Sequence, residues 1–151
     1  MVNNMEKIEL SRTKIHELAF ICVFQYLFYE QSKIEKDNRK RIDEIISDVM
    51  ESSFDDCDPF FKAIVFEAIK DKNINIENII QPKLVRWNFN NLSITDQAIL
   101  LLFTSEILNN RVESHVAIDM ALDLAHRYGA KDNSYKYINK VLDRISKEDA
   151  R

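Results

Sequence analysis

Two short segments of the sequence combine cationic and aromatic side chains in a pattern that suits contact with single-stranded RNA. Lysine and arginine pair with phosphates, and a base turned out of a single strand stacks on an aromatic ring. We therefore predict RNA contact at six residues near the two ends of the chain: Arg12, Lys14, His16, Phe24, Lys136 and Tyr137. The alternative is that the polar residues only begin a helix, and that Tyr137 is a core aromatic with its hydroxyl at the rim.

The overall charge limits how such contacts arise. The formal net charge is −4, whereas a non-selective nucleic-acid binder is usually basic because phosphate neutralisation supplies most of its affinity. Any RNA contact must therefore come from a local basic patch. We expect folding to bring the start of the first helix next to the last helix, with a positive surface between Arg12, Lys14 and Lys136.

Side chains suited to catalysis do not form a recognisable site. Glu17 and Glu106 lie beside apolar runs, where a structural carboxylate paired with a cation is commoner than a catalytic one. The sequence has no Gly-rich phosphate loop, nucleophile elbow or HExxH motif. We predict that the protein is not an enzyme and uses no cofactor.

The histidines and cysteines do not indicate a metal site. His115 and His126 lie about 16 Å apart along one predicted helix, too far for a single metal ion. His16 has no ligand partner at a suitable spacing, so we expect all three histidines at the surface or at an interface. Cys22 and Cys57 belong to no CxxC motif, and reduced, unpaired thiols suit the cytoplasm.

Helices must position these residues. The chain has 151 residues, with one Gly and two Pro, so it fits one domain and lacks the turns that a strand-rich fold needs. Apolar spacing predicts an all-α, single-domain bundle of about seven helices. Their expected ranges are 11–29, 41–50, 59–69, 74–87, 94–108, 114–128 and 133–146.

Short signals mark the helix ends. The expected N-caps are Ser11, Asp58 and Ser93. Asp96 should complete a capping box with Ser93. Pro82 should kink or split the helix that contains it, and Gly129 should adopt a left-handed conformation just past a helix.

The same patterns divide the chain into a flexible segment 1–10, a helical RNA- and protein-binding domain 11–146, and a tail 147–151. The longest apolar run is too short to cross a bilayer, and no signal peptide precedes it. We therefore expect a cytoplasmic protein that does not contact membranes.

Four stretches resemble the bacterial NusB family, and together they run along most of the chain. Val116–Gly129 resembles the family pattern VAINEAxELAKxFG, and Ser134–Ile145 is similar to SxKFVNGVLDKI. Upstream, Trp87–Leu100 resembles WxLxRLSxxERAIL, and Arg12–Ala19 resembles the opening RRxAREL.

The resemblance implies an all-α double bundle and a role in transcription antitermination. A NusB-type factor binds the boxA element of nascent RNA together with NusE, a small-subunit ribosomal protein, and so supports processive transcription of rRNA. The resemblance implies that the RNA-binding residues lie on the first and last helices. It also makes Asp96 and Glu106 candidates near the protein interface. We expect a monomer or a weak homodimer.

The chain departs from the family pattern at residues that bear on RNA. The arginine-rich opening is reduced to Arg12 and Lys14, with Thr13 and His16 at other usually basic positions, and Lys140 replaces a Gly. A second hypothesis therefore stays open, in which the chain is a helical protein-interaction module that has kept this fold and lost specific RNA binding. Titration of boxA-like RNA with and without the NusE-like partner distinguishes the two.

Overall fold

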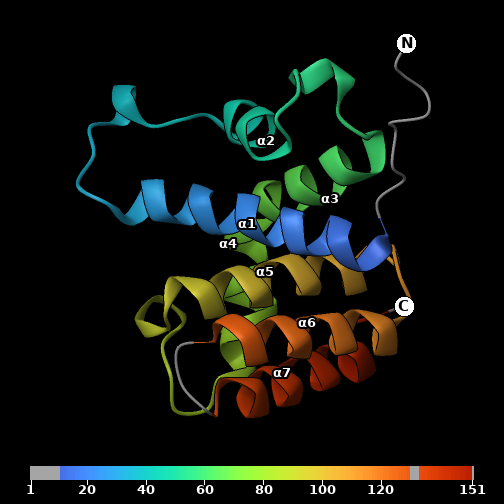
Figure 1. Ribbon diagram of the computed structural model, residues 1–151. Coiled ribbons are helices and arrows are strands. Elements are labelled where there is room, and N and C mark those ends of the chain that lie inside the picture. Colours follow the sequence, from blue (N-terminus) through green and yellow to red (C-terminus); the bar gives the residue numbers. More distant parts are fainter. Residues whose placement is uncertain (1–10, 130–132, 151) are drawn as a thin grey trace.

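The computed structural model describes residues 11–129 and 133–150. The segment 1–10, predicted to be flexible, lies outside the described residues. The helices, drawn in Figure 1, are α1 (Arg12–Gln31), α2 (Ile42–Met50), α3 (Pro59–Lys70), α4 (Lys72–Asn75), α5 (Ile94–Leu108), α6 (Ser114–Tyr128) and α7 (Ser134–Glu148). The described part of the chain contains no strand, so the predicted all-α fold is confirmed.

Helix α5 forms the centre of the molecule. Every side chain from Asp96 to Ile107 on this helix is buried. Helices α1 and α3 pack on one side of it and α6 and α7 on the other, while α2 packs on α1 (Figure 1). A helix that is apolar on all sides needs such a surrounding layer, and this arrangement gives the double bundle.

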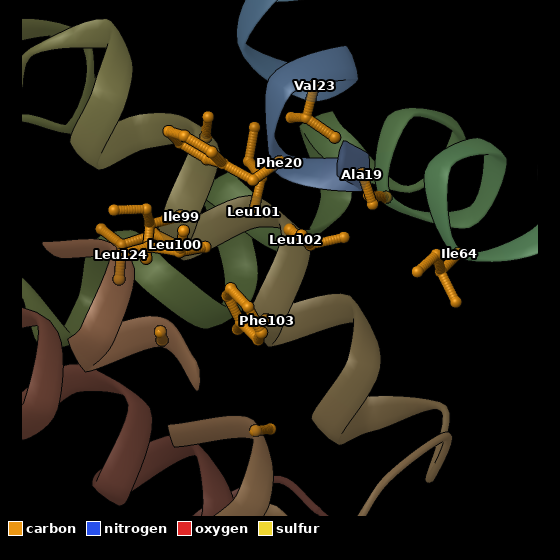
Figure 2. Packing of buried hydrophobic residues seen from close by; sticks show 14 of the residues in the cluster. Ala19, Phe20, Val23, Ile64, Ile99, Leu100, Leu101, Leu102, Phe103 and Leu124 are labelled. Carbon is orange, nitrogen blue, oxygen red and sulfur yellow. The ribbon is translucent and has the colours of Figure 1, made fainter. Parts of the chain in front are cut away.

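The hydrophobic core is continuous across α5. Figure 2 shows the α5 side chains from Ile99 to Phe103 among buried residues of the neighbouring helices, such as Phe20 of α1 and Leu124 of α6. The α5 residues in this run are fully buried. Because α5 packs against α1 and α3 on one side and against α6 and α7 on the other, it holds the two halves of the bundle in a fixed relation. No helix in the described ranges is both long and apolar enough to span a bilayer.

Three of the predicted helix starts are confirmed. The Ser11 hydroxyl accepts a hydrogen bond from the Lys14 amide, Asp58 accepts one from the Phe60 amide, and Ser93 caps α5. The predicted reciprocal bond from Asp96 is wrong. Its carboxylate turns towards α7 instead, because two hydroxyl groups of that helix donate to it.

The break expected at Pro82 is present, whereas the expected extent of that helix and the left-handed conformation of Gly129 are not. The predicted helix 74–87 is split into α4, a π-helical turn Ile76–Ile80 and a 3₁₀ turn Gln81–Lys83, after which residues 84–88 are not helical. Gly129 has φ −59° and is not left-handed. Glycine is required there for another reason, since a Cβ would lie 2.4 Å from the Ala125 carbonyl oxygen.

Candidate nucleic-acid interface

A surface pocket of about 540 Å³ lies where α5 and α7 begin. This volume falls within the range of small-ligand sites, roughly 300–1,000 Å³. The loop before α5 forms one wall and the first turns of α7 form the other. The lining residues are Trp87, Asn91, Leu92, Ser93, Asp96, Asn133, Ser134, Lys136, Tyr137 and Lys140.

Asp96 is a buried carboxylate in the lining of this pocket. One carboxylate oxygen, Oδ2, accepts hydrogen bonds from the Ser134 hydroxyl at 2.9 Å and from the Tyr137 hydroxyl. The other oxygen, Oδ1, is buried and has no hydrogen-bond partner among the described residues. Burial, and then the hydrogen bond to Asp96, raise the pKa of Tyr137. That hydroxyl therefore keeps its proton and acts as a donor to Asp96.

Cationic and aromatic side chains surround the mouth of the pocket. Lys136 and Lys140 are exposed and lie one turn apart on α7, and neither forms an ion pair with another described residue. The Trp87 side chain is 47% exposed. The first turns of α5 and α7 also carry the partial positive charge of helix N-termini. The arrangement can bind a phosphate at the rim and stack a base on an indole ring.

The cations near the start of α1 are arranged differently. Lys14 pairs with Glu17 at 3.3 Å, and the same carboxylate accepts a 2.7 Å bond from Arg127 of α6. Arg127 also pairs with Asp123. The Arg127 guanidinium is the main cause of a lowered pKa at Glu17, helped by Tyr128 and Lys14. Most of the positive charge here is therefore already neutralised within the protein.

The two cationic segments do not meet, and the expectation of a shared positive surface is wrong. His16 of α1 contacts Glu106 near the end of α5, whereas Tyr137 of α7 contacts Asp96 near its start. Ten residues of helix separate these contacts by about 15 Å. Figure 1 shows α1 and α7 beginning at opposite ends of the bundle, because α1 runs antiparallel to α5 whereas α7 runs in the same direction as α5.

The end of α6 connects the two regions through stacked rings. Tyr128 stacks on Phe20 of α1 with ring centroids 5.7 Å apart, and His126 stacks on Tyr135 of α7 at 4.4 Å. The Phe24 ring, predicted to contact RNA, is half-buried and packs near Phe20 at 6.5 Å. The end of α6 thus contacts α1 through one stack of rings and the start of α7 through another.

The expected surface position of His16 is wrong. The side chain is fully buried, with Nε2 hydrogen-bonded to Glu106 at 2.8 Å and Nδ1 to the Arg12 carbonyl at 2.8 Å. The ring stacks on Phe103 and lies edge-on to Phe60. A carboxylate distant in sequence draws the imidazole into the core, which the local spacing did not indicate. His16 therefore has a structural role and does not reach an RNA strand.

The two residues suggested for a protein partner are also buried. Glu106 has no exposed area and Asp96 is 3% exposed. Both carboxylates take internal hydrogen bonds, so neither contacts a docked protein directly. Of the residues predicted to contact RNA, Arg12, Lys14 and Lys136 are exposed, and Tyr137 is half-buried at the pocket.

Sequence analysis missed Trp87 and Lys140 as site residues. Lys136 and Lys140 are four residues apart, which places them on one face of a helix, and this spacing was a usable signal. No local pattern predicted the position of Trp87, because the pocket forms only when the loop before α5 packs beside α7. Among the described residues, no group of His, Cys, Asp and Glu is arranged to hold a metal ion.

The fold and the site define a small all-α protein with a basic, aromatic pocket on its surface. Comparison with known proteins identifies the family. The NusB family model matches residues 13–147, and the chain belongs to the NusB family. This confirms the resemblance that the motifs indicated.

The relatives agree on this family. The transcription antitermination protein NusB of Pseudothermotoga lettingae is 31% identical over 140 residues, which cover 90% of this chain and 91% of the relative. The NusB of Thermotoga sp. strain RQ2 is 42% identical over 84 residues, a stretch that covers 55% of this chain and 58% of that relative. The solved structure of Thermotoga maritima NusB has a TM-score of 0.73 at 28% identity, covering 95% of this chain and 96% of that one.

Proposed function

We propose that the protein is a transcription antitermination factor of the NusB type that binds single-stranded, boxA-like RNA. Membership of the family and the names of its relatives support the role in antitermination. The pocket between α5 and α7 is the proposed RNA site. The proposal involves no catalysis, and the residues act by binding and positioning the strand.

One observation carries the RNA proposal: two lysines that have no ion-pair partner among the described residues lie at the same pocket as a half-exposed indole. Lys136 and Lys140 supply positive charge for the phosphates on either side of a base. Trp87 supplies a face on which that base stacks, and Tyr137 adds a second aromatic wall. This local arrangement allows a chain of net charge −4 to bind a polyanion.

The start of α1 provides a second, weaker contact. Arg12 and Lys14 are exposed there, but Lys14 is already paired with Glu17. Tyr135, stacked on His126, and Tyr128, stacked on Phe20, lie on the proposed route of a strand from the pocket towards α1. The strand therefore gains most of its phosphate contacts at α7 and fewer at α1.

A NusE-like small-subunit ribosomal protein is the proposed partner. A surface that binds RNA modestly gains affinity when a second ligand holds the same RNA, because the second contact becomes intramolecular. Glu106 and Asp96 support this surface from inside the fold by fixing α1 and α7 on α5. The partner itself must contact other residues.

The test is a titration of labelled boxA-like RNA, followed by fluorescence anisotropy, with and without the NusE-like protein. We expect binding that strengthens with the partner and weakens as salt rises. The double variant Lys136→Ala/Lys140→Ala should weaken it. The matched control is Lys147→Ala, because Lys147 lies at the other end of α7 and pairs with Asp143.

The alternative of a protein-interaction module predicts a different result. In that case the RNA gives no signal with or without the partner, while the NusE-like protein still binds. An RNA signal that is equal in the wild type and in the Lys136→Ala/Lys140→Ala variant would place RNA binding away from the pocket and contradict the proposed site.

A further inference from the structure

We propose that the pocket between α5 and α7 is selective for a base, and that it prefers guanine. The inference rests on the proposed RNA-binding function and adds a specificity-determining residue, Asp96. The lysines at the rim bind any phosphate, and an indole stacks on any base. Selectivity must therefore come from a polar group inside the pocket.

Asp96 is a buried polar group in the lining of the pocket, and one of its oxygens has no hydrogen-bond partner among the described residues. Of its two oxygens, Oδ2 accepts the hydroxyl protons of Ser134 and Tyr137, while Oδ1 has no partner among the described residues. A buried acceptor without a donor is costly, and a ligand that supplies a donor removes that cost. The residue is held in place by its own bonds, so the free oxygen has a fixed direction.

The chemistry of Asp96 selects bases by their donor groups. A carboxylate accepts hydrogen bonds, so it favours base edges that present N–H groups. Guanine presents two adjacent donors, the ring N1–H and the exocyclic amino group, which the one oxygen without a partner, Oδ1, can accept together through its two lone pairs. Adenine and cytosine present a single amino group, and uracil a single ring N–H. Guanine therefore gains the most from an acceptor at this position.

The other lining residues are consistent with one stacked base. Trp87 offers an exposed indole face, while the half-buried Tyr137 directs its hydroxyl to Asp96 and leaves its ring as a wall. Lys136 and Lys140 lie outside the base at the level of the backbone phosphates. The cations are therefore at the rim and the carboxylate is the buried part of the lining, so Asp96 need not contact a phosphate.

The experiment compares four nonameric RNAs: eight uridines with a central guanosine, inosine or adenosine, and nine uridines. Inosine keeps the ring N1–H of guanosine and lacks the amino group. With the wild-type protein we expect guanosine to bind about tenfold more tightly than adenosine or uridine, and inosine to fall between them. This arm needs no variant, so protein folding does not affect its outcome.

A substitution then identifies Asp96 as the source of the preference. In Asp96→Asn the hydroxyls of Ser134 and Tyr137 still have an oxygen to donate to, and an NH₂ group takes the position of Oδ1. An acceptor is thus replaced by a donor. We expect the guanosine preference to disappear, so that the RNA with a central guanosine binds no more tightly than the RNA with a central adenosine. Thermal unfolding of the variant checks that it is folded.

The outcomes separate the two proposals. If all four RNAs bind equally and Lys136→Ala/Lys140→Ala weakens all of them, the pocket binds RNA and the guanine inference is wrong. A guanosine preference that survives in a folded Asp96→Asn protein also overturns the role of Asp96. If none of the four binds and no boxA-like RNA binds with the partner present, the proposed function itself fails.

Discussion

Helix α5 carries a buried carboxylate near each end, and the two have different roles. Glu106 is enclosed by α1, where it bonds to the buried His16 beside the rings of Phe103 and Phe60. Asp96 is similarly buried but lines an open pocket. The same kind of residue on the same helix thus holds the bundle together at one end and lines a surface pocket at the other.

The basic segments show the same contrast. At the start of α1, Lys14 and Arg127 are bound to carboxylates of the protein. At the start of α7, Lys136 and Lys140 have no acidic partner among the described residues. The number of cations in a segment therefore says less about RNA binding than whether the fold has already paired them.

The largest expected effect lies at the closed end of α5. Glu106→Ala removes one partner of a fully buried pair and leaves Nε2 of His16 without its hydrogen-bond partner, so we expect a loss of about 3 kcal/mol in the free energy of unfolding. Urea denaturation measures it. Asp96→Asn, which keeps the bonds from α7, should cost about 1 kcal/mol or less. Equal losses would remove the distinction between the two ends.

Replacing the cationic residues of each segment by alanine tests the contrast between the start of α7 and the start of α1. Lys136→Ala/Lys140→Ala should weaken binding of single-stranded RNA about thirtyfold and reduce the slope of log K against log salt by about 1.4, as two phosphate contacts are lost. Arg12→Ala/Lys14→Ala should weaken it about threefold. Anisotropy titrations at several salt concentrations measure both losses of affinity. A larger loss in Arg12→Ala/Lys14→Ala than in Lys136→Ala/Lys140→Ala would place the main RNA site at α1.

A third prediction separates stacking from charge within the pocket. Trp87→Ala should weaken RNA binding about tenfold without changing the salt slope, because a ring releases no counterions. Tyr128→Ala, which removes the ring of α6 that stacks on Phe20 of α1, should weaken RNA binding less than Trp87→Ala does. A change in the salt slope of Trp87→Ala would mean that the loop, rather than the ring, matters.

The smallest effect concerns the ion pairs at α1. The pKa of Glu17 is lowered from its ordinary value of 4.5 by Arg127. A carboxyl group with a lowered pKa in the folded state stabilises the protein above its unfolded pKa, and this contribution disappears as pH falls below about 4.5. Glu17→Gln should therefore cost about 0.5–1 kcal/mol at pH 7 and much less at pH 3. Urea denaturation at both pH values measures the difference.

Local sequence signals predicted the helices well. Ser11, Asp58 and Ser93 cap helices as expected, since a cap needs only neighbours within a few residues. Signals that depend on packing were harder to interpret. Asp96 has the spacing of a capping box with Ser93, yet two hydroxyls of α7 outcompete that local bond.

The candidate site could not be predicted from the sequence alone, for the same reason: its residues come together only through packing between helices. Within its own helix His16 contacts only the Arg12 carbonyl, and the carboxylate that holds its other ring nitrogen, Glu106, lies ninety residues away. Trp87 gains a role only because the loop before α5 meets the start of α7. The motifs identified the family, and the sequence correctly predicted that Lys136 and Tyr137 lie near the start of the last helix. The prediction that the start of α1 lies beside the start of α7 was wrong, because local sequence patterns do not show which ends of packed helices lie together.

The most direct test of the pocket uses the single tryptophan of the chain, Trp87. Its intrinsic fluorescence reports on the pocket without any label or variant. On titration with single-stranded boxA-like RNA, we predict a saturable change in emission with the same Kd as labelled-RNA anisotropy, weakening together with it as salt rises. Binding seen by anisotropy with no change in Trp87 emission would contradict the account.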